Sequence, residues 1–64
     1  MKTKLKAARK KEGLTQAQVA AQTQISERIY QEYESGRRTP PVDKAIRLAR
    51  ILHSSVEELF YLKE

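Results

Sequence analysis

The chain has 64 residues, with 13 Lys and Arg against 8 Asp and Glu, no cysteine, and a pI near 9.8. This length fits one domain, residues 1–64, without room for a separate catalytic domain, and the lack of cysteine excludes disulfides and thiolate metal sites. No apolar run approaches the roughly 20 residues of a membrane span, and no secretory signal is recognisable, so we expect an intact soluble protein. The basic charge favours a nucleic-acid partner, although a solvated lysine face would give the same composition.

The first predicted element is a helix over residues 2–12. Leu5 and Ala8 share one face at helical spacing, and lysines occupy most of the rest. Gly13 supplies the left-handed residue that commonly ends a helix. Arg9 lies beside Leu5 and Ala8 rather than opposite them, so the pattern places one charged residue on the inward face.

The next stretch predicts two short helices joined by a tight turn. Thr15 and Gln18 have the spacing of a capping box, which begins a helix over about residues 16–22. Ser26 is the N-cap of the second helix, which covers about residues 27–35. The turn between them is three residues long.

The second of these helices has one apolar and one polar face. Ile29, Tyr30 and Tyr33 form the inward face, so we interpret the two tyrosines as packing residues. The outer face is polar and consists of Glu27, Arg28, Gln31 and Glu32. Two short helices with a polar outer face on the second are typical of a DNA-reading helix-turn-helix.

Two further helices are expected beyond Gly36, which ends the preceding one. A helix over about residues 42–52 has a wide apolar stripe, made of Val42, Ala45, Ile46, Leu48, Ala49 and Leu52. Ser55 and Glu58 fit a second capping box, which begins a helix of one to two turns. Its inward residues are Val56, Leu59 and Phe60. The sequence therefore predicts an all-α fold of five short helices around one core.

Several short motifs occur in order along the chain at fixed spacing. They are Gly13-Leu14-Thr15-Gln16, Ala20, Ile25-Ser26, Glu34-Ser35-Gly36-Arg37, Pro40, Leu48-Ala49, Ile51-Leu52 and the ending from Ser55 to Phe60. Together they resemble the helix-turn-helix domains of the phage Cro and repressor family, also called xenobiotic-response-element regulators. The resemblance implies a lambda-repressor-like fold and a cytoplasmic, nucleoid-associated protein, bacterial or phage-encoded. Its function would be sequence-specific binding of double-stranded DNA as a transcriptional regulator, as a repressor.

The resemblance also implies roles for particular positions. The base-reading set would be Glu27, Arg28 and Glu32, with Gln31 open between a base edge and the backbone. The residues expected at the DNA backbone are Gln16, Ser26, Ser35, Arg37 and Arg38. Arg9 and Glu34 match a pair that forms a buried salt bridge in the family, which accounts for an arginine on an inward face, since a buried charge needs a partner.

The chemistry of the outer face suits base reading. Arg28 could donate two hydrogen bonds to O6 and N7 of guanine, and Glu27 or Glu32 could accept from the N4 amino group of cytosine. The alternative is that Arg28 and Glu32, four residues apart, pair with each other on a solvated face. Arg37 and Arg38 are expected to bind phosphates of the DNA backbone. The alternative is that they are ordinary surface charge.

The chain departs from the family at two turns. The family usually has glycine where this chain has Gln24 and His53. If these residues adopt left-handed backbone, each substitution costs roughly 1 kcal/mol relative to glycine.

A homodimer is expected, because one helix-turn-helix covers one half-site and two reading helices lie about 34 Å apart on an operator. Phe60, Tyr61 and Leu62 close the chain where relatives place their dimer contact. The alternative is that Phe60 belongs to the core and the two residues after it fray.

Other classes of function have less support. A protein-binding adaptor, antitoxin-like or anti-repressor, would need a sizeable exposed apolar patch that the sequence does not reveal. Thr15, Ser26 and Ser55 are better explained as helix caps than as nucleophiles. With no cluster at metal-ligand spacing and no phosphate-binding glycine loop, we predict no enzyme, no metal, no cofactor and no small-molecule ligand.

Overall fold

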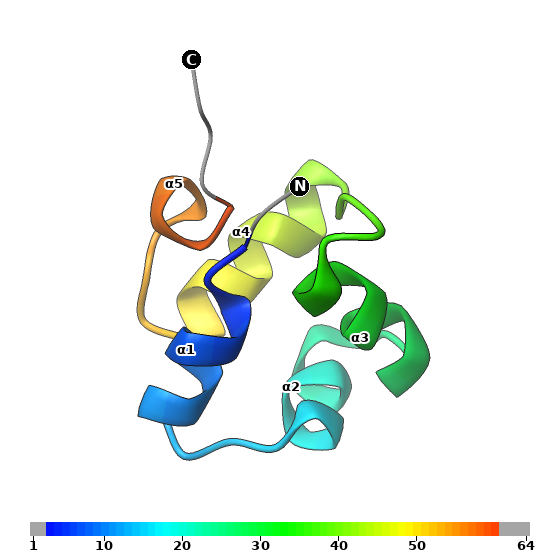
Figure 1. The fold of residues 1–64 in the computed structure, drawn as a ribbon, viewed down its shortest axis with the longest axis horizontal. Helices are drawn as coiled ribbons and strands as arrows, with labels where there is room; N and C mark the ends of the chain where they lie inside the picture. The colour runs from blue at the N-terminus through cyan, green and yellow to red at the C-terminus, as the bar shows by residue number, and fades with distance from the viewer. Residues whose placement is uncertain (1–2, 61–64) are drawn as a thin grey trace.

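The computed structural model describes residues 3–60, which form five helices and no strand (Figure 1). The helices are α1 (Leu5–Lys11), α2 (Gln16–Thr23), α3 (Glu27–Ser35), α4 (Val42–Ile51) and α5 (Val56–Leu59). In Figure 1, α3 and α5 lie on opposite sides of α4. The all-α fold class is therefore confirmed. None of these described helices is long and apolar enough to cross a membrane.

Side-chain caps fix where α2 and α3 begin. The hydroxyl of Thr15 accepts from the backbone N–H of Gln18 at 3.1 Å, and the Gln18 side chain accepts from the Thr15 N–H at 2.8 Å, which completes the predicted capping box. The hydroxyl of Ser26 accepts from the N–H of Ile29 at 3.1 Å. These bonds satisfy backbone donors that have no partner within the helix.

Left-handed residues end α2 and α3. Gln24 follows α2 with φ of 63°, and Gly36 follows α3 with φ of 84°. His53, after α4, is also left-handed at φ of 52°. The two positions where glycine was expected therefore have the backbone that favours glycine, with the cost that this implies.

The start of α1 and the cap of α5 differ from the prediction. Residues 3 and 4 are not helical, because the N–H of Lys4 donates to the carbonyl oxygen of Leu59 at 2.7 Å and joins the segment before α1 to α5. The prediction of a second reciprocal capping box is only half met. Ser55 accepts from the N–H of Glu58 at 3.1 Å, but the Glu58 carboxylate accepts from the hydroxyls of Ser54 and Ser55. The helix α5 is a single turn, within the predicted one to two turns.

The core lies where α2 packs against α3 and α4, and where α5 packs against α4. Its buried apolar residues are Leu5, Val19, Ala20, Tyr30, Tyr33, Ala45, Leu48, Ala49, Leu52, Leu59 and Phe60. The prediction that both tyrosines are packing residues is confirmed, with Tyr30 fully buried.

The apolar stripe of α4 is narrower than predicted. Val42 is 75% exposed and Ile46 is 43% exposed. The residues of α4 that are buried are Ala45, Leu48 and Ala49, on the side that faces its neighbours. Val42 and Ile46 belong to the stripe but stay exposed, because the neighbouring helices do not reach its outer edge.

Candidate nucleic-acid interface

The outer face of α3 points to solvent. Glu27, Arg28 and Gln31 are exposed, and Glu32 is half-buried. A shallow hollow of about 370 Å³ runs along this face, lined by Arg28, Gln31, Glu32, Ser35 and Arg37. The structure thus brings three of the predicted base-reading residues together with two residues predicted to contact the DNA backbone.

Gln16, the first residue of α2, joins α2 to two positions on α3. Its amide nitrogen donates to the Oε2 atom of Glu34 at 2.5 Å, and its amide oxygen accepts from the Nε2 atom of Gln31 at 3.3 Å. These bonds add to the apolar packing between the two helices. They fix the position of α3 relative to α2 on the polar side of the contact.

Arg9 and Glu34 form an ion pair between α1 and the end of α3. Arg9 Nε lies 2.8 Å from Glu34 Oε1, and Arg9 Nη2 lies 3.5 Å from Glu34 Oε2. Arg9 also donates to the carbonyl oxygen of Leu14 at 3.0 Å. The side chains of Arg9 and Glu34 are only 12% and 7% exposed. The structure therefore brings together the pair that the resemblance implied.

The hydroxyl of Tyr30 also donates to Glu34, at 3.1 Å. Burial opposes ionisation of Glu34, but hydrogen bonds from Arg9 and Gln16 outweigh it and lower the pKa of the carboxyl below its ordinary value. Burial, with the nearby Glu34 carboxylate, raises the pKa of Tyr30. The hydroxyl of Tyr30 therefore stays protonated and donates within this network.

Glu32 holds the loop that follows α3. Its carbonyl oxygen accepts from the N–H groups of Arg37 and Arg38, at 3.0 and 3.2 Å, and from the Ser35 hydroxyl at 3.2 Å. Its carboxylate accepts from Arg38 Nε at 2.6 Å. In the structure Glu32 thus pairs with Arg38 rather than with Arg28, the partner that helical spacing suggested.

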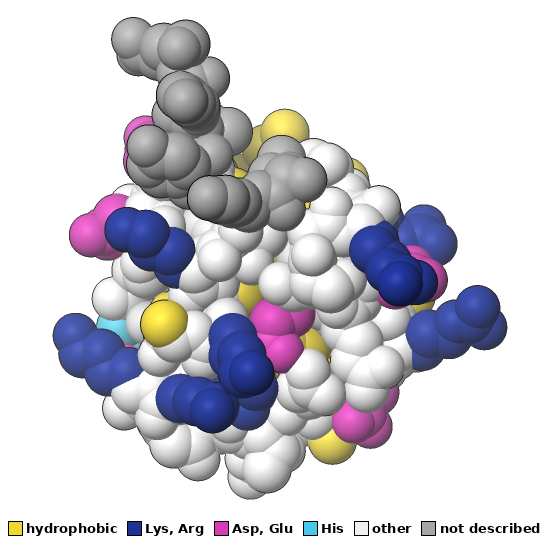
Figure 2. Space-filling view, viewed as in Figure 1, with side chains coloured by type: hydrophobic (Ala, Val, Ile, Leu, Met, Phe, Trp, Pro, Cys, Tyr) yellow, Lys and Arg dark blue, Asp and Glu magenta, His cyan; other side chains and the backbone are white. Residues whose placement is uncertain are grey.

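The remaining predicted site residues are Ser26, at the start of α3, and the expected dimer contact Phe60, Tyr61 and Leu62. Ser26 is exposed, with its hydroxyl used as the N-cap of α3. Phe60 is 3% exposed and belongs to the core, while Tyr61 and Leu62 lie outside the described residues. Figure 2 shows Lys and Arg side chains over α1 and along the edge of the molecule that α3 occupies. Asp and Glu side chains lie among them on that edge, so both signs of charge meet beside α3.

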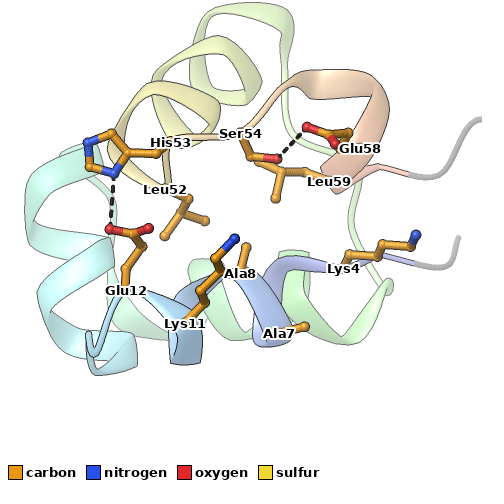
Figure 3. Close-up of a pocket in the computed structure, with 10 residues that line it drawn as sticks. All are labelled: Lys4, Ala7, Ala8, Lys11, Glu12, Leu52, His53, Ser54, Glu58 and Leu59. Carbon is orange, nitrogen blue, oxygen red and sulfur yellow. Dashed lines mark hydrogen bonds and ion pairs between the residues drawn. The ribbon is translucent and has the colours of Figure 1, made fainter.

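A separate hollow of about 350 Å³ lies between α1, the segment that follows α4, and α5 (Figure 3). His53 Nδ1 lies 3.0 Å from Glu12 Oε1 across its rim, and Lys4 and Lys11 also line it. None of its lining residues comes from α2 or α3. Among residues 3–60, no buried side-chain nitrogen or oxygen lacks a hydrogen-bond partner, and no acidic or histidine cluster could hold a metal ion.

A model of the helix-turn-helix family matches residues 5–59. The chain therefore belongs to this family, in its Cro and repressor type, a class of DNA-binding regulators and not of enzymes. A transcriptional regulator from Listeria innocua has a similar solved structure, with a TM-score of 0.74 and 29% sequence identity. The similarity covers 100% of this chain and 64% of that regulator's chain. No curated protein matches the chain significantly.

Proposed function

We propose that this protein is a sequence-specific regulator of transcription, acting as a repressor, that places α3 in the major groove of an operator half-site. The observation that carries the proposal is the exposed polar face of α3, which the bonds from Gln16 hold in place. A recognition helix needs such a fixed orientation so that its side chains meet base edges in one register. We further propose that it acts in the cytoplasm as a homodimer on a two-half-site operator.

Two exposed side chains carry base reading in this proposal. Arg28 is exposed beside the hollow of α3, so its guanidinium is available for the two acceptors of a guanine. Glu27, in the first turn, can accept from the amino group of cytosine. Gln31 is tied to Gln16, and its free amide atoms can meet an adenine edge or a phosphate.

Glu32 has a different task in this proposal: it positions Arg38. The bond to Glu32 uses the Nε of Arg38 and leaves both terminal nitrogens of the guanidinium to donate to a phosphate. Ser35, the last residue of α3, and Arg37, in the loop after it, line the same hollow as Glu32. These contacts place the protein on the backbone without reading sequence.

Selection of bound sites from random duplex DNA tests the proposal. We expect a palindromic consensus with half-sites about one helical turn apart, and a steep fall of affinity with salt. Arg37→Ala should weaken binding to all sequences alike, whereas Arg50→Ala, which removes the same charge from an exposed position on α4, should leave the affinity nearly unchanged. No duplex binding in about 50 mM salt would contradict the proposal.

A protein-binding adaptor is the second candidate, and one observation favours it. Val42 and Ile46 expose apolar surface that the sequence did not reveal. This candidate predicts that the protein binds no duplex in low salt and that another protein covers this surface.

A further inference from the structure

An apolar groove of about 160 Å³ lies between α4, α5 and the loop before α4. Its lining includes Pro40, Val42, Ala45, Ile46, Val56 and Phe60. Val42 and Ile46 are the large apolar residues most exposed to solvent in the described part of the chain. Burying them would remove apolar area from water, which is the main favourable term in protein association.

We propose that this groove and the outer face of α4 bind a second copy of the same chain, with the two α4 helices antiparallel about a twofold axis. This inference rests on the homodimer of the proposed function and assigns its surface. It places the contact on α4 and not on the chain end alone. In such a pair, Val42 of one copy lies against Ile46 of the other.

The charges of α4 support a second copy as the occupant. Asp43 and Arg47 are exposed, one helical turn apart, in the row next to Val42 and Ile46. An antiparallel arrangement brings the first half of one helix against the second half of the other. Asp43 of each copy then lies near Arg47 of the other, so that the surface is complementary to itself in charge as well as in apolar area.

The position of the groove fits a dimer on one duplex. It begins at Thr39, the residue after Arg38, in the loop that we propose to contact phosphates. A copy bound there would bring the two loops close to the twofold axis. Two exposed apolar residues per copy are few beside the roughly 20–30 residues a side of a standard interface, so we expect a weak dimer that DNA strengthens.

A charge exchange in α4 tests the arrangement, with sedimentation equilibrium of the full chain up to about 1 mM as the measurement. Asp43→Arg puts Arg at both positions and Arg47→Asp puts Asp at both, so each variant alone should self-associate at least about tenfold more weakly. Mixed in equal amounts they should form a heterodimer in which both cross-helix charge pairs are restored. Mixing leaves the charges within each variant's own helix unchanged. Recovered association in the mixture therefore shows that residues 43 and 47 of different copies contact each other.

Val42→Asp gives a second measurement, because its side chain is largely exposed and its removal should leave the fold intact by circular dichroism. We expect loss of self-association and loss of cooperative binding to a two-half-site duplex, with unchanged binding to one half-site. Ala7→Asp, an exposed apolar position on α1 with the same change in charge, is the control.

Three results would overturn the assignment: a wild type that stays monomeric to about 1 mM and binds two half-sites independently, a mixture that stays monomeric, or a Val42→Asp variant that dimerises normally. The first would leave another protein as the occupant of the groove. Because self-association is measured without DNA, a failure of duplex binding would contradict the proposed function and leave this result standing.

Discussion

The outward faces of α3 and α4 differ in how their side chains are held. On α3, Gln31 is bonded to Gln16, and Glu32 is bonded to Arg38. On α4, Val42 and Ile46 meet solvent without apolar neighbours to cover them fully. The difference indicates two kinds of recognition: a polar face whose groups are fixed before binding suits reading of a rigid groove, and an apolar face suits burial against another protein.

The largest expected effect comes from removing the support of α3. Glu34→Ala would leave the mostly buried Arg9 without its ion-pair partner, and the side chains of Gln16 and Tyr30 without their acceptor. We expect a loss of about 3–5 kcal/mol in the free energy of unfolding, measured by urea denaturation. Glu57→Ala, which removes an exposed carboxylate from α5, should cost less than about 1 kcal/mol. Equal losses in both variants would mean that the pair does not support α3.

The pH dependence of stability tests the same contribution of Glu34. Glu34 has a lowered pKa in the folded state, so its contribution is present above its ordinary pKa of 4.5 and is lost as pH falls through the folded value. We expect the free energy of unfolding to fall as the solution is acidified below about pH 4.5, and to fall less in Glu34→Gln, which has no charge to lose. Thermal denaturation across that range gives the measurement. If the stability of the wild type fell no more steeply with pH than that of Glu34→Gln, the stabilising role of the Glu34 charge would be contradicted.

Removing one reading group should affect DNA and leave the fold unchanged. Arg28 is exposed, so Arg28→Ala should change the free energy of unfolding little while costing about 1–3 kcal/mol in affinity for the selected site and relaxing one base position. Binding to the selected duplex and to single-base variants of it gives the measurement. An unchanged base preference would remove Arg28 from the reading set.

The smallest effect concerns the turn that sets α3 against α2. Gln24 has left-handed backbone, so Gln24→Gly should raise the free energy of unfolding by about 1 kcal/mol. Gln22→Gly, two residues earlier and exposed within α2, should lower it by about 0.5–1 kcal/mol. A Gln24→Gly variant no more stable than the wild type would show that the turn does not favour glycine.

Local signals made the recognition helix predictable from the sequence. Ser26 and Gly36 supply an N-cap and a left-handed end, and α3 has the predicted limits of residues 27–35. The ion pair of Arg9 with Glu34 was expected only through the family resemblance, because the two residues are 25 positions apart and helical spacing cannot relate them.

Other features depend on tertiary structure that periodicity does not report. An apolar stripe shows which residues share a face of α4, and not how far the neighbouring helices cover it, so the exposure of Val42 and Ile46 was missed. The partner of Glu32 was also missed, because the path of the loop after Gly36 brings Arg38 back to it. Whether Phe60 joins a dimer contact stays a prediction, although the residue itself is buried.

Nuclear magnetic resonance of the labelled protein bound to its selected duplex tests most directly whether α3 enters the major groove. We expect intermolecular contacts between the side chains of Glu27 and Arg28 and the major-groove protons of the bases, and contacts of residues 35–38 only with the sugar and phosphate backbone. Contacts to the bases from α1 or α4, with none from α3, would contradict the proposed function.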